Sequence, residues 1–187
     1  MKKVLNNVEI GLVILAITTA ILGFFPSKIS SNLAVFSFML LGMFYLFVSA
    51  FHFKSDAPKT SIMHILGLIG TGFSLSVFNN TILFKLMNWP GADKMQMLGL
   101  GLGTLPILFY GFRYFQTKSS VYSKILTRFI IFAIVSLCLF PITRMQIMEL
   151  KYRNHPDYIN AVKDYEANTD SPEKLQKLHE ERNKLGL

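Results

Sequence analysis

The sequence has few acidic residues in the part of the chain that is most apolar. It contains 11 Asp and Glu, and only three of them precede residue 144: Glu9, Asp56 and Asp93. None of the three is predicted to lie in the interior of an apolar segment. Ion-driven machines usually carry the proton on a carboxylate within the membrane. The sequence therefore argues against a motor or pump driven by ions.

Cysteine is also scarce, with Cys138 as the single example. One cysteine allows neither an intrachain disulfide nor a cysteine-based metal cluster. The four histidines, among them His52 and His64, do not have the spacing of a metal site. No phosphate-binding loop and no Ser/His/Asp constellation is suggested. We therefore expect no catalytic residues, no metal site, no cofactor and no enzymatic activity.

Hydrophobic residues, in contrast, make up 51% of the 187 residues. The mean hydropathy of +0.40 is too high for a soluble domain of this size, so apolar surface must face membrane lipid. The net charge is +8, but residues 144–187 carry eight charges of each sign, and the excess basic residues are spread over short loops. Because no basic helix or cluster is present, nucleic acid is not an expected partner.

Five segments approach the roughly 20 apolar residues that cross a bilayer. Their expected ranges are 8–25, 33–53, 62–86, 95–115 and 125–142. The predicted fold class is an all-α polytopic membrane protein with two tandem hairpins, at 8–53 and 62–115, and a fifth span. Residues 1–147 form the transmembrane domain and residues 148–187 a soluble helical tail.

Lys and Arg are distributed unevenly between the two sides of this topology. With a cytoplasmic N-terminus, the outer loops hold only Lys28, Lys85 and Lys94. The inner side then holds the other eight: Lys2, Lys3, Lys54, Lys59, Arg113, Lys118, Lys124 and Arg128. Cytoplasmic loops carry such an excess. The bias predicts a multi-pass protein of a bacterial inner membrane, with a cytoplasmic N-terminus and a periplasmic C-terminus.

The tail is predicted to form two short helices. One begins near Pro156 and ends around Ala167, and the other follows Ser171 as its cap and stops at Gly186. Forty residues bury little apolar surface by themselves. We therefore expect the tail to pack on the membrane part or on a partner.

The turn between the third and fourth spans is rich in turn-forming residues. Pro90 has no amide hydrogen and favours extended geometry at Asn88 and Trp89. Gly91 permits a positive φ, and Asp93 is expected to cap the next helix by accepting from its free N–H groups. Trp89 is typical of the aromatic belt at a membrane interface.

Lys85, just before this turn, has two interpretations. In the first, its stem lies along the helix surface while the ammonium group reaches the lipid headgroups, as snorkelling lysines do. The alternative is an inward-facing charge that pairs with a neighbouring subunit.

Asn79 and Asn80 are the most polar side chains within a predicted span. Amides in hydrocarbon need partners, and hydrogen bonds between membrane helices meet that need. We expect the pair to hold helices together, with a solute or ion site as the alternative.

Several glycines are spaced for close helix packing. Gly99 and Gly103 form one small-xxx-small pair, and Gly72 with Ser76 forms another. Small residues at this spacing allow membrane helices to approach closely, so the third and fourth helices are predicted to pack tightly.

A weak internal repeat relates the two hairpins. Shifting the sequence by 61 residues aligns Gly11 with Gly72, and it places Thr18 and Thr19 on Asn79 and Asn80. Both copies enter the membrane from the same side, so the pattern indicates a parallel duplication of a two-helix unit.

The segment from Ile82 to Gly99 reads ILFKLMNWPGADKMQMLG. Its Leu83-Phe84-Lys85 run, its Pro90-Gly91 pair and the later Met95 and Met97 resemble the hairpin of the GldL-like N-terminal domain. That family belongs to the inner-membrane motor of gliding motility and type nine secretion in Bacteroidetes. Asn88 stands where the family usually has a histidine. The resemblance covers one hairpin of about forty residues.

The resemblance implies a shared lineage but a different role. The motor proteins place a membrane glutamate in the second helix of this hairpin, and the corresponding stretch from Gly99 to Leu108 has no acid. The single hairpin of the family is also followed by a long cytoplasmic region, which differs from the five spans expected here. A proton-driven stator is therefore not predicted.

These patterns predict an integral inner-membrane protein that is a non-catalytic subunit or accessory of a larger cell-envelope complex. Its expected partners are membrane lipid and other membrane-protein subunits. The alternative is a small transporter or channel with a polar path near Thr18/Thr19 and Asn79/Asn80. A third hypothesis, an enzyme acting on lipid, would use the polar groups of the turn between the third and fourth spans.

Overall fold

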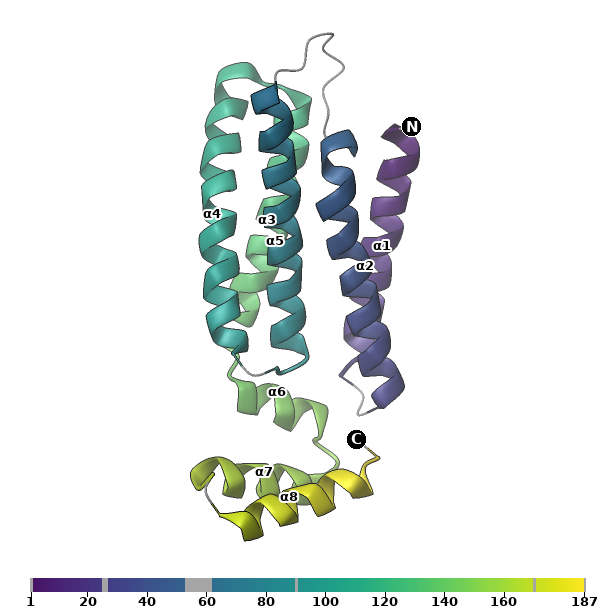
Figure 1. Cartoon of the computed structure of the whole chain (residues 1–187), viewed down its shortest axis with the longest axis vertical. Coiled ribbons are helices and arrows are strands. Elements are labelled where there is room, and N and C mark those ends of the chain that lie inside the picture. The colour runs from purple at the N-terminus through teal and green to yellow at the C-terminus, as the bar shows by residue number, and fades with distance from the viewer. Residues whose placement is uncertain (1, 25–26, 53–61, 90, 170, 187) are drawn as a thin grey trace.

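The computed structural model describes residues 2–24, 27–52, 62–89, 91–169 and 171–186. This part of the chain contains eight helices and no strand, and Figure 1 shows five long helices side by side above three short ones. The long helices are α1 (Lys2–Leu22), α2 (Lys28–His52), α3 (Ile62–Leu86), α4 (Ala92–Thr117) and α5 (Ser120–Leu139). The short helices are α6 (Arg144–Lys151), α7 (Pro156–Ala167) and α8 (Pro172–Lys184).

The five long helices are long and apolar enough to cross a membrane, which confirms the all-α polytopic fold with five spans. The bounds of α3 are those predicted. In contrast, α1 begins at Lys2 rather than at residue 8, and α5 ends at Leu139 rather than at residue 142. The apolar pattern locates each span, but polar residues extend the helices at their ends.

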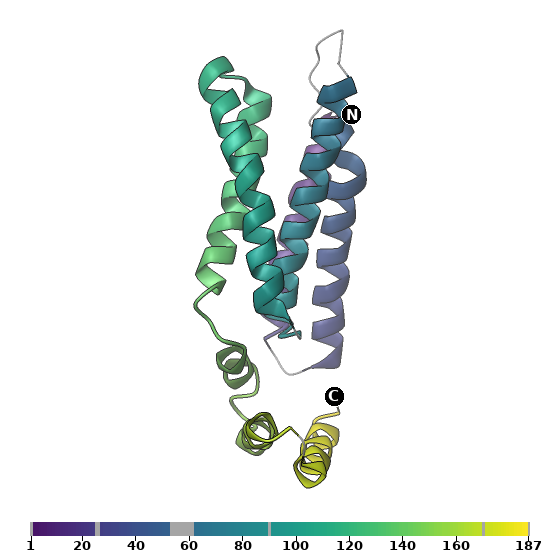
Figure 2. The same cartoon turned by 60° about the vertical axis from the view of Figure 1, so that its left-hand side comes forward.

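Helix α3 lies at the centre of the bundle, where it packs against α2, α4 and α5, while α1 packs on α2. The views in Figures 1 and 2 agree on this order. The core is formed mainly by aromatic and branched side chains of α2, α3 and α5, including Phe38, Leu41, Tyr45, Leu75, Phe78, Ile125 and Phe129. Half of the apolar stretch of α3 is buried inside the protein, so this helix has the least contact with lipid.

The outer surface of the bundle is apolar. Large exposed side chains occur on every long helix, among them Ile14, Phe36, Phe47, Phe73, Leu108, Phe112 and Ile134. A contiguous apolar surface of this kind is a liability in water, and hydrocarbon is the solvent that suits it.

Glycine spacing brings α4 onto α3, as predicted. A Cβ atom at Gly99 would lie 2.5 Å from Thr81 Oγ1, and one at Gly103 would lie 2.7 Å from Phe78 Cδ1. Both neighbours are buried side chains of α3. The absence of a side chain at these two positions therefore sets the separation of the two helices.

Gly72 also serves close packing, but against a different helix. A Cβ atom there would overlap the Ser49 side chain and the Tyr45 carbonyl oxygen, both on α2. The expectation that Gly72 joins α3 to α4 is wrong, because the side of α3 that carries Gly72 packs on α2. Other residues of α3 contact α4.

The tail lies beyond one end of the bundle, opposite to the N-terminus (Figures 1 and 2). Helix α7 begins at Pro156 and α8 at Pro172 after its cap Ser171, as predicted. Helix α6 is an addition to the prediction. It starts with a capping box in which Thr143 and Gln146 exchange side-chain and backbone hydrogen bonds.

The tail has a small core of its own, made by Met148, Tyr152, Ile159 and Val162 with Tyr158, Leu178 and Leu185 around them. A polar contact also joins the tail to the membrane part, because Lys151 Nζ donates to Ser31 Oγ of α2 at 3.0 Å. Both alternatives for the tail, packing on the membrane part and packing on a partner, remain compatible with this arrangement.

The lysines of the predicted outer loops lie at the end of the bundle opposite to the N-terminus, as predicted. Lys28 begins α2 and Lys94 lies in the first turn of α4, and both helices begin at the tail end of the bundle. Lys54 and Lys59, which contribute to the predicted charge bias, lie outside the described residues, and so do the side chains of His52 and His64.

Candidate functional site

Glu9 lies inside the bundle, contrary to the sequence-based expectation. Helix α1 begins at Lys2, so Glu9 stands about 10 Å along the helix at 1.5 Å per residue. Glu9 as a whole is 4% exposed. The prediction that no acid lies within a span is therefore wrong. The sequence pattern had placed the start of the first span at residue 8, so Glu9 was expected at the edge of that span.

Arg128 of α5 forms an ion pair with Glu9. Its Nε atom donates to Oε1 and its Nη2 atom donates to Oε2 of the carboxylate, while Nη1 donates to the Lys124 carbonyl oxygen at 2.8 Å. Tyr45 of α2 donates its hydroxyl to Glu9 Oε1 at 2.9 Å. Bidentate guanidinium–carboxylate pairs are strong and directional, so this cluster joins α1, α2 and α5 at one point.

A signal for this pair was present in the sequence. Glu9 is the only acid in the first predicted span, and Arg128 lies near the start of the fifth, on the side of the membrane predicted for residue 9. Burying either charge alone is costly, and pairing reduces the cost. Sequence separation hid the pair, because the two partners are 119 positions apart in the chain.

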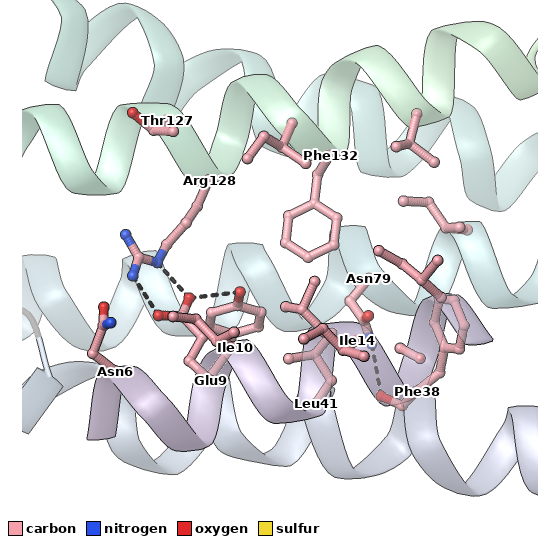
Figure 3. A pocket seen from close by; sticks show the side chains of 17 residues that line it. Asn6, Glu9, Ile10, Ile14, Phe38, Leu41, Asn79, Thr127, Arg128 and Phe132 are labelled. Carbon is pink, nitrogen blue, oxygen red and sulfur yellow. Dashed lines mark hydrogen bonds and ion pairs between the residues drawn. The ribbon is translucent and has the colours of Figure 1, made fainter. Parts of the chain in front are cut away.

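A pocket adjoins this cluster, with a volume of about 370 Å³. It lies between α1 and α5, and α2 and α3 form its floor (Figure 3). Polar side chains are concentrated at one end, where Asn6, Glu9, Thr127 and Arg128 line it. The remaining lining is almost entirely apolar: Ile10, Val13, Ile14, Ala16, Ile17, Phe38, Leu41, Ile82, Ile131, Phe132 and Val135, with Tyr45 and Asn79 as the other polar members.

The pocket opens on the lipid-facing surface of the bundle. Ile10, Ile14 and Ile17 of α1 and Ile131 of α5 line it and are also exposed on the outside of the protein. The pocket is therefore open sideways, between α1 and α5.

Asn79 of α3 lies on the floor of this pocket and is 0% exposed. Its Nδ2 atom donates to the Phe38 carbonyl oxygen of α2 at 2.7 Å, which confirms the predicted role of holding helices together. Its Oδ1 atom is buried and has no hydrogen-bond partner in the structure. Buried polar atoms are nearly always bonded, so this oxygen is an exception within the core of the bundle.

The residues that the internal repeat aligns with Asn79 and Asn80 have different environments. Thr19 is buried and its hydroxyl bonds Ser37 Oγ at 2.5 Å, whereas Thr18 is exposed. The 61-residue shift aligns the exposed Thr18 with the buried Asn79. Of the four residues, Asn79 alone lines the pocket, so the two pairs do not form one polar path there.

Lys85 is buried at the end of α3, with 2% of its side chain exposed. Its Nζ atom lies 2.5 Å from Asp93 Oδ1 in the first turn of α4. Lys85 therefore pairs within its own chain, and both the snorkelling interpretation and the pairing with a neighbouring subunit are wrong. Asp93 makes no side-chain capping bond; the cap residue of α4 is Gly91, with φ of 79° as predicted.

Asn88 ends α3 in the left-handed conformation, with φ of 57°, rather than in the extended geometry expected before Pro90, which itself lies outside the described residues. The amide of Asn88 donates to Lys85 O at 3.1 Å, and that of Trp89 donates to Phe84 O at 3.1 Å. These are the two bonds of a Schellman cap, and the accompanying apolar contact is the Trp89–Phe84 ring pair at 4.8 Å. Asparagine tolerates this conformation well.

Further polar contacts between helices were not predicted from the sequence. Gln96 of α4 is buried and donates from Nε2 to the Ser136 carbonyl oxygen of α5 at 2.6 Å. The hydroxyls of Thr71 on α3 and Tyr110 on α4 also bond each other. A hydropathy pattern does not show that these side chains are partners, because each is a single polar residue within an apolar run.

Comparison of the chain with known protein families, curated proteins and solved structures finds no match.

Proposed function

We propose that this chain is a non-catalytic subunit or accessory of a larger membrane complex in the bacterial cell envelope. The α3–α4 hairpin would share its lineage with the GldL-like domain, without the motor's role. The proposed topology has a cytoplasmic N-terminus and a periplasmic tail in the inner membrane.

The pairing of the buried charges carries this proposal. Among the described residues, two charged residues are classed as buried, Glu9 and Lys85. Glu9 is held by Arg128 and Tyr45, and Lys85 is paired with Asp93. An ion-driven machine needs a membrane carboxylate that exchanges its proton during the cycle. A carboxylate held by a bidentate arginine suits a structural role instead, because exchange would require the pair to break.

The tail supplies a surface suited to a protein partner. Helix α8 packs on α7 through Leu178 and Leu185, and none of its residues is fully buried. Glu173, Gln176 and Glu180 are exposed and are spaced three and four residues apart, so they lie on one face of the helix. The exposed Lys177 and Lys184 lie on the same face, so this α8 face carries charges of both signs and suits a charged surface of another subunit.

Photo-crosslinking in the native membrane tests this proposal. A photoreactive amino acid at Gln176 is expected to give one discrete protein adduct in cells, and the double variant Glu173→Lys, Glu180→Lys is expected to abolish it. The matched control places the same group at Leu108, an exposed residue of α4, where lipid is the expected neighbour. Absence of a discrete adduct from Gln176, or an adduct that persists in the double variant, would contradict a partner at this α8 face.

A small transporter or channel is the second candidate, and one observation favours it. Asn79 lines the pocket between α1 and α5, and its buried Oδ1 atom has no hydrogen-bond partner. Flux assays in liposomes decide between the two functions: a transporter predicts solute or ion flux that is lost when Asn79 and Asn80 are replaced by leucine. The proposed subunit predicts no flux in either protein.

A further inference from the structure

We propose that the end of the bundle at the turn between α4 and α5 binds anionic lipids, through contacts of Arg113, Lys118 and Lys124 with the headgroup phosphates. These three residues form the basic α4–α5 end. It lies at the same end of the bundle as the N-terminus (Figures 1 and 2). The inference does not rest on the proposed subunit role, because the tail lies at the opposite end of the bundle.

The charge of the basic α4–α5 end is not neutralised within the described part of the chain. No Asp or Glu occurs in the sequence between Asp93 and Glu149. All three cations are exposed, and they take part in none of the ion pairs found among the described residues. Their charges are therefore available to anions outside the chain.

Aromatic rings orient two of the three cations. Arg113 Cζ lies 5.7 Å from the centroid of the Tyr122 ring of α5. Lys118 Nζ lies 5.3 Å from the centroid of the Tyr114 ring and 5.2 Å from that of the Phe115 ring. These are cation–π distances. Because a ring carries no net charge, the two side chains are held in place while their charges stay available to a phosphate.

The backbone at Lys118 is unusual for a lysine. This residue is the C-cap of α4 and has a left-handed conformation, with φ of 51°. Glycine is the usual residue at such a position, because a side chain there costs free energy. The chain therefore keeps a cation where glycine would be less strained. A glycine substitution at this position removes the charge without straining the backbone.

The depth of the basic α4–α5 end matches that of lipid headgroups. At 1.5 Å per residue, the 26 residues of α4 are about 39 Å long, and the hydrocarbon core of a bilayer is about 30 Å thick. The last turn of α4 therefore lies at headgroup level. Phe112 and Phe115, beside the cations in the sequence, are exposed and suit acyl chains. A lipid supplies both phosphate and hydrocarbon, whereas a soluble anion supplies only the charge.

Photo-labelling with matched lipids tests the inference. The full chain in phosphatidylcholine nanodiscs receives a trace of photoreactive phosphatidylglycerol or photoreactive phosphatidylcholine, with the same diazirine placed near the glycerol end of one acyl chain. Labelled residues are mapped by mass spectrometry. We expect phosphatidylglycerol to label the basic α4–α5 end at least about fivefold more, which is the effect of one basic residue near an anionic surface. The preference should fall as salt is raised, because exposed charges are screened.

Substitutions at the two ends of α4 separate a local contact from an effect of net charge. The triple variant Arg113→Gln, Lys118→Gly, Lys124→Gln should be labelled equally by the two lipids. The matched control Lys94→Gln removes an exposed cation from the first turn of α4 and should keep the preference. Lys118→Gly alone should weaken the preference without lowering the midpoint of unfolding, so that loss of lipid contact is distinguished from loss of fold.

Three results would overturn the proposal. The first is equal labelling of the basic α4–α5 end by the two lipids in the unaltered protein. The second is a preference that survives the triple variant. The third is a preference that Lys94→Gln removes as well, because net charge alone would then explain it.

Discussion

Glu9 and Arg128 come from the first and last of the long helices, and their ion pair joins α1 to α5 at one point. The guanidinium group makes two hydrogen bonds to the carboxylate, and Tyr45 adds a third from α2. The side chains of Arg128 and Glu9 are 15% and 5% exposed. In such surroundings the loss of one partner leaves a charge without compensation, and this costs more than the pair itself contributes.

A double-mutant cycle should therefore show strong coupling between these two residues. We expect Glu9→Gln or Arg128→Gln alone to lower the free energy of unfolding by about 3–5 kcal/mol. The double variant should cost less than the sum of the two, because no unpaired charge remains. Unfolding in mixed detergent micelles with increasing SDS measures the three values.

The exposed pair of Lys177 and Asp164 in the tail is the matched control. Both side chains are more than half exposed, so Asp164→Asn should cost only about 0–1 kcal/mol. Additive effects of the two bundle substitutions would contradict a coupled, buried pair.

At the scale of the elements, the glycines of α4 set how closely it approaches α3. Gly99 and Gly103 face Thr81 and Phe78, whereas a Cβ atom at Gly101, between them, would meet nothing within 4 Å. The three glycines lie on one helix and in one sequence pattern. Only the structure shows that Gly99 and Gly103 contact α3 and that Gly101 does not.

Alanine substitutions should reveal this difference. Gly99→Ala and Gly103→Ala should each lower the free energy of unfolding by about 1–3 kcal/mol, because buried neighbours must shift. Gly101→Ala should be neutral or stabilising by up to about 1 kcal/mol, since alanine is the better helix former. Unfolding in the same mixed micelles checks all three. Equal effects at the three positions would show that α4 does not pack on α3 through Gly99 and Gly103.

The core of the tail predicts a pH dependence. Burial raises the pKa of Tyr152 to about 12, from an ordinary value near 10. The folded tail thus holds this proton more firmly than the unfolded tail does. Its contribution to stability is complete below pH 10 and is lost as the pH rises from 10 to 12.

The difference in tyrosinate absorbance between the unaltered protein and Tyr152→Phe isolates this titration from those of the other tyrosines. The expected midpoint lies near pH 12 in the folded protein and near pH 10 after denaturation. A midpoint near 10 in the folded protein would mean that Tyr152 is not buried in the tail.

Sequence patterns predicted the elements well and the contacts between them poorly. Hydropathy located all five long helices, and Pro156 and Ser171 located the starts of α7 and α8, because these signals are local. The partner of Lys85 was missed although Asp93 is only eight residues away. Whether a lysine faces lipid or a neighbouring helix depends on the rotation of the helix, which hydropathy does not specify.

The same limit applies to the candidate site. Asn79 was identified as a residue that holds helices together, but its pocket is assembled from four helices that are distant in the sequence. Glu9 was assigned to the edge of a span because the first span was predicted to begin at residue 8. Helix α1 in fact begins at Lys2, and no local pattern contains the pairing of Glu9 with Arg128.

At the scale of the whole molecule, the bundle and the tail have different surfaces. The bundle presents apolar side chains suited to lipid, and its two buried charges are paired within the chain. The tail gathers beyond one end and presents charged, exposed residues of α8. This division is what a membrane-anchored subunit with an extramembrane contact requires.

The particle mass in the native membrane tests the proposed subunit role most directly. The protein is extracted with its surrounding lipid into polymer nanodiscs, without detergent, and the protein mass is measured by native mass spectrometry. The proposed subunit role predicts a mass above the 21.3 kDa of the single chain, because a second membrane protein is bound at a fixed ratio. In the Glu173→Lys, Glu180→Lys variant the mass should fall to 21.3 kDa. A single species of 21.3 kDa from unaltered membranes would contradict it.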